Sequence, residues 1–544
     1  MAPPKRPVSG GDAAASKQRK LGSANPPAAH ASPSAAGSDE DAASDSDAAT
    51  CPHIDGAYLD TVNRACLDFD FEQLCSVSLS SSNIYACLVC GKYYQGRGKQ
   101  TQAYFHSIND SHHVFINLRT LRAYVLPDGY EVKDRSLNDI KNAVQPQYSP
   151  HHVAQLDTCL ESGYDLGGKP YRPGFVGLNR IKHNSYMNAV VQALAHVPPI
   201  RDMLLLLPDR DGQPALLQRM AVLVRKMWHG RLFKAHVSPH EFAQEVADRS
   251  RRRFRLDVEG DAFEFLTWLL NTLHMDLGGT RKKGSSVIYT TFQGQIRATT
   301  HGSEASRDPA SEGGRPQPDT SQSAVVEKMP FLALSLELPP KPLFTSASVD
   351  TSGDGDGDDR TDIPQVALTA LLQRYNGSTA IESNGKLRQY QPVRLPQYII
   401  CHIKRFSKGG PMAEKNPTVV NFPIHGVRFG DLLPCDASQQ HCRDTTYDLI
   451  VNICHIGQQM PAAANTSGRQ SDTGQPPPVA QPDTPTASAA NSSAESPFVA
   501  YIRCSASGKW YMLRDLHVEP AMPQVLCLSD SYIQIWQRND SSVH

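Results

Sequence analysis

The chain has 544 residues, with 54 Lys and Arg against 55 Asp and Glu, and 12 cysteines. The balanced charge excludes a protein that binds nucleic acid through bulk positive charge, and the cysteines are too sparse for a disulfide scaffold. No apolar run reaches the ~20 residues that a membrane-spanning helix needs, so no membrane partner is expected. The N-terminus lacks the apolar core of a secretory signal, which favours an intracellular location.

The first 50 residues are rich in Ala, Ser, Pro, Gly and Asp and contain almost no large apolar side chain. Such a segment cannot bury enough surface to offset its ordering entropy, so residues 1–50 are predicted to be a disordered tail. Two basic clusters, Lys5-Arg6 and KQRK at 17–20, are separated by ten residues. This layout is typical of a bipartite nuclear localisation signal and predicts a nuclear protein, although a solvated basic tail fits the same residues.

A Cys/His-rich segment at 51–150 follows the tail. Its candidate metal ligands are Cys87, Cys90, His106, His112 and His113. Two thiolates on one turn and two imidazoles suit a tetrahedral zinc site, and the gap between the pairs matches that of such sites. A helix predicted from about Thr101 places the first histidine late on the helix and the others beyond its end. The spacing does not decide which of the two adjacent histidines is the ligand.

Three further residues are candidates for a second metal site: Cys51, His53 and Cys75. No tetrad can be completed from them, so ordinary thiols are the expected alternative. Whether a second zinc uses these residues stays open at this point.

A larger mixed region runs from about 172 to 540. Three Gly/Pro/Ser/Thr-rich stretches interrupt it and predict inserted loops, at 301–326, 345–363 and 458–495. An amphipathic helix is predicted over 259–274, because apolar residues recur there at helical spacing. Strands are predicted over 287–297 and 329–339.

The sequence YACLVCGKYYQGR at 85–97, followed by AYFHSINDSHH, resembles the zinc finger of ubiquitin-specific proteases. The resemblance implies a structural Zn²⁺ held by four protein ligands: Cys87, Cys90, His106 and His112. A second zinc site of the family falls on Gln95 and Gln102, and is therefore expected to be lost. Arg97 matches a family arginine that helps to bind the carboxy-terminus of ubiquitin.

The region 172–540 resembles the catalytic domain of the same family, in boxes such as GFVGLNRIKHNSYMNAVVQAL and LPQYIICHIKRF that keep the family's order. The resemblance implies an α+β protein, in which a small zinc finger precedes a papain-like ubiquitin-specific-protease fold. It also implies strands over 395–406, 447–457, 498–518 and 531–538. The finger-like subdomain of the family often holds zinc with two Cys-x-x-Cys pairs. No such pairs occur after residue 150, so no zinc is expected there.

The catalytic positions that the resemblance carries over are mostly replaced. The nucleophile position is Ser185, the oxyanion position is Arg180, the general-base position is Pro497, and only the orienting Asp515 is retained. Proline cannot accept a proton, and serine is nucleophilic only beside a base. The sequence therefore predicts an inactive homologue of a cysteine protease with no catalytic residues.

Further segments, including EKNPTVVNFPI and SYIQIWQR, resemble the splicing-associated members of this family that act with the U4/U6.U5 tri-snRNP. This implies a non-catalytic nuclear protein that supports pre-mRNA splicing through assembly or stability of the tri-snRNP, whose proteins are the expected partners. One alternative is an active hydrolase that pairs Ser185 with His455 or His517. Another alternative is an adaptor that binds ubiquitin through the finger.

Two basic segments, SRRRFRL at 250–256 and TRKKG at 280–284, raise the question of direct RNA contact. Short charge runs of this kind usually form a solvated face. The sequence leaves RNA contact open.

Overall fold

The computed structural model describes residues 57–70, 72–208, 212–301, 325–340, 364–383, 386–406, 413–433, 445–456, 459–460 and 497–539. The predicted tail with its two basic clusters lies outside these residues, as do Cys51 and His53. Most of the three low-complexity stretches also lies outside them.

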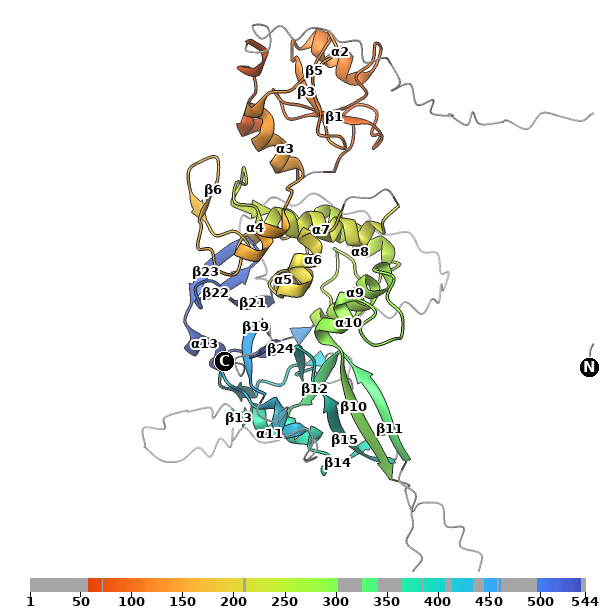
Figure 1. Cartoon of the computed structure of the whole chain (residues 1–544), viewed down its shortest axis with the longest axis vertical. Coiled ribbons are helices and arrows are strands. Elements are labelled where there is room, and N and C mark those ends of the chain that lie inside the picture. Colours follow the sequence, from red (N-terminus) through yellow and green to blue (C-terminus); the bar gives the residue numbers. More distant parts are fainter. Residues whose placement is uncertain are drawn as a thin grey trace, which may run out of the picture. The chain divides into compact units, whose positions relative to one another are not determined.

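The Cys/His-rich region contains a five-stranded antiparallel sheet in the order β2-β1-β3-β4-β5 (Figure 1). The strands are β1 (Ile84–Cys87), β2 (Tyr93–Gln95), β3 (Val114–Asn117), β4 (Ala123–Val125) and β5 (Tyr130–Val132). The helices are η1 (Arg64–Cys66), α2 (Gln102–Asn109), η2 (Arg135–Leu137) and α3 (Asn138–Val144). Apolar side chains from the sheet and α3 form one core, which explains why these short strands hold together.

A helical layer precedes the large sheet in sequence (Figure 1). It comprises α4 (Pro150–Gln155), α5 (Ser185–Ala195), α6 (Pro198–Leu205), α7 (Ala215–Trp228), α8 (His240–Arg249), α9 (Ala262–Asp276) and α10 (Val287–Phe292). Every residue of α5 is buried, because this helix is apolar nearly all round and packs against α6, α9 and the strand β21. A helix of this kind holds the residue at its N-terminus in a fixed position.

The large sheet has seven strands in the order β12-β16-β24-β19-β21-β22-β23. Their bounds are β12 (Ala333–Glu337), β16 (Tyr398–Lys404), β19 (Tyr447–His455), β21 (Phe498–Arg503), β22 (Trp510–Arg514), β23 (His517–Ala521) and β24 (Ser531–Arg538). The strand β12 runs parallel to β16, and the other neighbours are antiparallel. Long apolar runs form the central strands, since both faces of the sheet are covered by cores.

A four-stranded antiparallel sheet has the order β11-β10-β15-β14. Its strands are β10 (Gly294–His301), β11 (Val325–Phe331), β14 (Ala380–Ser383) and β15 (Lys386–Arg394). The remaining strands pair two by two, as β6 (Gly163–Tyr164) with β7 (Pro170–Tyr171), β8 (Gly177–Leu178) with β9 (His236–Val237), β13 (Gln365–Ala367) with β18 (Val419–Asn421), and β17 (Ala413–Glu414) with β20 (Gln459–Met460). The remaining short helices are α11 (Leu368–Leu372), η3 (Gln373–Tyr375), η4 (Phe429–Leu432) and α13 (Pro523–Leu528).

The α+β class and most predicted elements are confirmed, including the helix α9 and the strands at 395–406, 447–457 and 531–538. The strand predicted over 287–297 is wrong in its first half, because Val287–Phe292 forms the helix α10. The β-branched and aromatic residues of this run favour a strand, but Ser286 caps a helix there by accepting from the Tyr289 N–H. Burial of Ile288 and Phe292, four residues apart, then favours one helical face.

Candidate functional sites: a Cys/His cluster and a hydrolase-like centre

Four side chains of the finger converge on one point. Cys87 ends β1, Cys90 follows in the tight turn, His106 lies in the last turn of α2, and His112 follows that helix. One ligand atom from each residue lies within 4.8 Å of all the others. The Cys90 Sγ is 3.4 Å from the His106 Nε2, which is in turn 3.0 Å from the His112 Nδ1. Two sulfurs and two imidazole nitrogens form a closed donor set suited to structural zinc.

Neighbouring groups orient the His106 ring and favour ionisation of the Cys90 thiol. The His106 Nδ1 lies against the carboxylate of Asp110, which leaves Nε2 to face the sulfurs. Metal-binding histidines commonly have such a carboxylate partner, because it sets the tautomer. The Tyr94 ring stacks on His106 at 4.2 Å between centroids. A hydrogen bond from Cys87 lowers the pKa of the Cys90 thiol to about 4, so this group favours the thiolate form that metals bind.

The neighbouring histidine has other contacts. The His113 Nδ1 lies 2.8 Å from the Leu126 carbonyl, across the β3–β4 pair, and its ring packs on Tyr58. This position depends on strand register, which the Cys/His spacing does not encode. Cys75 is buried, and its sulfur accepts from the Ser78 N–H at 3.4 Å. Within the described residues, the cluster of Cys87, Cys90, His106 and His112 is the one group of such side chains that could hold a metal.

The residues related to the family's ubiquitin site and second zinc site make contacts inside the finger. The Gln95 Oε1 accepts from the Ser78 hydroxyl, and the Gln95 Nε2 donates to the Ser82 hydroxyl. The Arg97 guanidinium lies 4.4 Å from the centroid of the Tyr124 ring and donates to the Gly129 carbonyl. A ligand would have to compete with these contacts for this arginine.

Ser185 is the first residue of α5 and is 1% exposed. Its hydroxyl donates to the Glu259 Oε1 at 2.6 Å. Glu259 comes from the segment that leads into α9, two residues before the helix cap Asp261. Gly260 between them is required, because a Cβ there would meet the Tyr186 ring at 2.7 Å. The nucleophile position of the fold is thus occupied by a serine bonded to a carboxylate.

Glu259 was not identified from the sequence. Burial raises the pKa of its carboxyl group, and the hydrogen bond from Ser185 and the charges of Arg180 and His183 oppose this rise. The His183 Nδ1 lies 3.7 Å from the Glu259 Oε2 on the outer side, where its side chain is half exposed. The sequence offers one signal for this residue: acids stand on both sides of Gly260, and only Asp261 is needed to cap α9. The other acid, Glu259, is therefore free for a second role.

The retained aspartate is held by an amide. The Asn188 Nδ2 donates to the Asp515 Oδ1 at 2.8 Å and to the Asn179 carbonyl at 3.2 Å. Asn184 joins the same network by donating to the Asn188 Oδ1 at 3.1 Å. Asp515 has a left-handed backbone with φ of 50°, in the turn between β22 and β23. A carboxylate that would orient an imidazole in an active relative is here bonded to Asn188.

Pro497, His455 and His517 are the remaining positions at which the sequence analysis considered a base for Ser185. Pro497 immediately precedes β21, and its carbonyl accepts from the Ile456 N–H at 2.6 Å. His455 is buried between the rings of Phe406 and Phe498, and His517 is exposed at the start of β23. Among the described residues, the side-chain partner of the Ser185 hydroxyl is Glu259, so neither histidine makes the predicted alternative pair.

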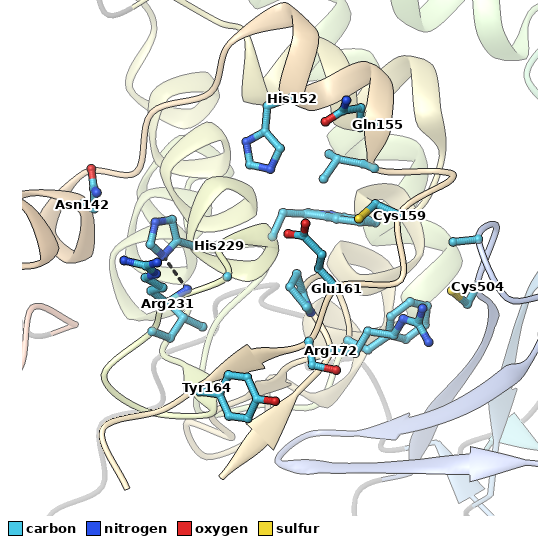
Figure 2. A pocket seen from close by; sticks show the side chains of 18 of the residues that line it. Asn142, His152, Gln155, Cys159, Glu161, Tyr164, Arg172, His229, Arg231 and Cys504 are labelled. Atoms are coloured by element: carbon cyan, nitrogen blue, oxygen red, sulfur yellow. Dashed lines mark hydrogen bonds between the residues drawn. The ribbon is translucent and has the colours of Figure 1, made fainter. Parts of the chain in front are cut away.

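A cavity of about 780 Å³ lies in the same part of the protein (Figure 2). None of the four positions that correspond to the family's catalytic residues lines it: Arg180, Ser185, Pro497 and Asp515. Phe175, Trp228 and buried His196 form part of the wall, and burial lowers the pKa of His196 to about 4. Figure 2 also shows Glu161 and Cys159 beside the cavity. Neither Cys159 nor Cys504 has a recorded hydrogen bond to a histidine among the described residues, so this cavity presents no thiolate–imidazole pair.

A buried helix that presents its first residue beside a sheet bearing an orienting aspartate is the framework of a papain-like hydrolase. Here that framework has Ser185, Arg180 and Pro497 at the positions of the nucleophile, the oxyanion donor and the base. The chain matches the family described as ubiquitin carboxyl-terminal hydrolase over residues 176–536, and it belongs to this family. Residues 75–137 match the zinc finger found in ubiquitin hydrolases and other proteins.

Several curated relatives span most of the chain. Ubiquitin carboxyl-terminal hydrolase 39 of Homo sapiens is 41% identical over 497 residues, which cover 89% of this chain and 80% of that protein. The probable mRNA-splicing protein ubp10 of Schizosaccharomyces pombe is 39% identical, with coverage of 89% and 88%. The pre-mRNA-splicing factor SAD1 of Saccharomyces cerevisiae is 28% identical, with coverage of 89% and 94%.

A solved structure described as an essential yeast splicing factor has the same architecture. It matches with a TM-score of 0.65 and 27% identity, and the match covers 89% of this chain and all of that one.

In the part of this chain that the structure describes, no helix is both long and apolar enough to cross a lipid bilayer.

Proposed function

We propose that this protein is a non-catalytic member of the ubiquitin carboxyl-terminal hydrolase family that supports pre-mRNA splicing. It acts in the nucleus, through assembly or stability of the U4/U6.U5 tri-snRNP, whose proteins are its partners. The observation that carries the non-catalytic assignment is the buried hydrogen bond between Ser185 and Glu259, in a site where Pro497 replaces the base. The splicing assignment is supported by the relatives ubp10 and SAD1, whose names describe splicing proteins.

The chemistry of the site argues against the alternative of an active serine hydrolase. An acyl-transfer centre needs a base that removes the nucleophile's proton and later delivers it to the leaving amine. A carboxylate is a far weaker base than imidazole near neutral pH. Arg180, at the oxyanion position, has its Nε bonded to the Lys182 carbonyl at 2.9 Å and its charge near Glu259. The arrangement stabilises a resting serine.

We also propose that the finger binds one Zn²⁺ through Cys87, Cys90, His106 and His112. A closed set of four protein ligands leaves no open position for substrate, so the ion is structural. When bound, zinc would join the turn after β1 to the end of α2. The adaptor alternative, in which the finger binds ubiquitin, has less support, because Arg97 already contacts Tyr124 and Gly129.

The experiment that tests the proposed function is affinity purification of the tagged full-length protein from nuclear extract. The proposal predicts recovery of the U4, U5 and U6 RNAs and of tri-snRNP proteins. The Ser185→Ala variant should recover the same set at the same yield, because no covalent chemistry is involved. Recovery of ubiquitin conjugates without these RNAs would contradict the proposal.

A further inference from the structure

Two helices of the large domain end beside each other. The Nη2 of Arg249, the last residue of α8, lies 3.0 Å from the Oδ1 of Asp276, the last residue of α9. The loops at 250–255 and 280–283 therefore leave from neighbouring points on the surface. These are the two basic segments that the sequence assigned to a solvated face.

The loops carry more positive charge than their neighbours neutralise. Arg253 pairs with Glu264, and Arg255 pairs with Asp257 at 3.3 Å. The cations with no acidic partner among the described residues are Arg251, Arg252, Arg281, Lys282 and Lys283, and all five are exposed. Two unpaired acids, Glu245 and Asp248, lie on α8 nearby, so five minus two leaves a surplus of three positive charges.

A groove of about 730 Å³ lies along α9 beside these charges. Its lining includes Arg249, Arg253, Phe263, Glu264, Trp268 and Asn271. The two lining arginines are paired with Asp276 and Glu264, so the unpaired positive charge comes from the loops that flank the groove. Trp268 is half-buried, and its ring packs at 5.3 Å from Phe254 and 6.0 Å from Phe265. These contacts hold the indole in place while part of it faces the groove. We name the five unpaired cations and this groove together the α8–α9 basic groove.

The backbone conformation of the first loop has an energetic cost for the two arginines at its start. Arg251 and Arg252 have φ of 54° and 62°, in the left-handed region that favours glycine. Their N–H groups close the end of α8 by donating to the Asp248 and Ala247 carbonyls. Glycine is the usual residue at such a helix end. Two consecutive arginines there present cations at a cost in backbone energy, which points to a use for the charges.

We propose that the α8–α9 basic groove binds single-stranded RNA, which goes beyond the scaffold role above. The loop arginines and lysines contact phosphates, and a base stacks on Trp268. The Asn271 Nδ2 donates to the Thr267 carbonyl, which leaves the Asn271 Oδ1 to accept from the edge of the base. Proteins that bind single strands combine a basic track with an aromatic stacking surface in this way. An acidic protein segment would need the charges alone, whereas a half-exposed indole inside the basic groove suits an unpaired base. Bases are available for stacking in single strands rather than in A-form duplexes.

The charge contribution is tested by fluorescence anisotropy of a fluorescein-labelled twelve-nucleotide uridine RNA with the full-length protein over a series of salt concentrations. Arg251→Gly/Arg252→Gly should weaken binding and reduce the slope of log affinity against log salt by about 1.4, or about 0.7 for each lost phosphate contact. Glycine suits these φ values, so the melting temperature should not fall. The matched control Lys99→Ala/Lys509→Ala removes two exposed cations elsewhere and should leave both quantities unchanged.

The stacking contribution is tested with Trp268→Leu, whose folding is checked by circular dichroism. Loss of one stacked base should weaken RNA binding roughly 5- to 100-fold without a change in salt slope. Equal RNA affinity in the wild type, Trp268→Leu and the double glycine variant would overturn the proposal. Equally tight binding of a poly-glutamate peptide of the same charge, insensitive to Trp268→Leu, would also overturn it and assign the surface to an acidic protein.

Discussion

At the scale of single residues, the side chains around Ser185 decide what this site can do. Its hydroxyl, Glu259, Arg180 and His183 form a compact polar group at the start of α5. Asp515, at the position that orients the base in active relatives, accepts a hydrogen bond from Asn188. Each position that corresponds to a catalytic residue of the family and carries a polar side chain thus has a hydrogen-bond partner within the protein.

Replacing Glu259 by glutamine tests the buried carboxylate. The glutamine side chain would keep an oxygen for the Ser185 hydroxyl and remove a charge whose burial raises the pKa of the carboxyl group. A carboxyl group with a raised pKa in the folded state binds protons more readily there, so the wild type loses stability as pH rises from the unfolded pKa through the folded pKa. We expect Glu259→Gln to melt about 1–3 °C above the wild type at pH 7.5.

That advantage should shrink as pH falls toward the unfolded pKa of glutamate, because the wild-type carboxyl then becomes neutral as well. Thermal melts of both proteins between pH 4.5 and 7.5 check this. Glu264→Gln, at an exposed carboxylate on α9, is the control with the same chemical change. A lower melting temperature of Glu259→Gln at pH 7.5 would show that the charge is stabilising and contradict the account.

Restoring the thiol alone should not restore hydrolysis. Catalytic residues act as a unit, and Ser185→Cys still lacks an imidazole at 497 and an oxyanion donor at 180. These contribute about 10²–10⁴ and about 10²–10³ in rate respectively. We expect no turnover of ubiquitin-rhodamine by Ser185→Cys. The triple variant Ser185→Cys/Arg180→Asn/Pro497→His tests whether the fold still frames a site, and turnover by the single variant would refute the unit argument.

At the scale of elements, the finger is the part whose stability depends on a metal. Replacing Cys87 and Cys90 by serine should remove one zinc per chain, since hydroxyls are poor ligands for this ion. Metal binding supplies about 10–16 kcal/mol in isolated zinc fingers, so residues 57–144 should become sensitive to proteases. Elemental analysis of the full-length protein gives the zinc content. Cys66→Ser/Cys159→Ser changes two exposed cysteines outside the cluster and should retain the zinc.

The basic clusters of the tail are the second element with a direct test. Changing Lys5, Arg6 and the three basic residues of 17–20 to alanine should leave a reporter fused to residues 1–50 in the cytoplasm. The physical reason is that both patches are needed for the bipartite signal. Fluorescence microscopy of the two reporters measures this, and unchanged nuclear accumulation of the alanine variant would refute the assignment.

Elements with a clear period or spacing could be predicted from the sequence. The helix α9 has apolar residues at helical spacing, and the cysteines and histidines of the finger have zinc spacing. The helix α10 was missed, because its β-branched run favours a strand. The cap at Ser286 and the burial of Ile288 and Phe292 on one helical face favour the helix instead. Glu259 was missed because its partner Ser185 lies 74 residues away in the chain. A contact at that separation is created by packing, which no local pattern encodes.

At the scale of the whole molecule, a hydrolase framework is preserved, and three of its four catalytic positions carry other residue types. The central sheet, the buried helix α5 and the finger all remain, and the family match covers residues 176–536. Such a framework offers broad surfaces, of which the α8–α9 basic groove is one. We therefore propose that this protein acts by binding rather than by turnover.

The most direct test of this central claim is the rate of ubiquitin-rhodamine hydrolysis by the unmodified full-length protein, measured beside Ser185→Ala. We predict that both proteins release rhodamine at the rate of buffer alone, because among the described residues the Ser185 hydroxyl donates to the carboxylate of Glu259. Release by the unmodified protein that Ser185→Ala abolishes would contradict the account and make this protein an enzyme.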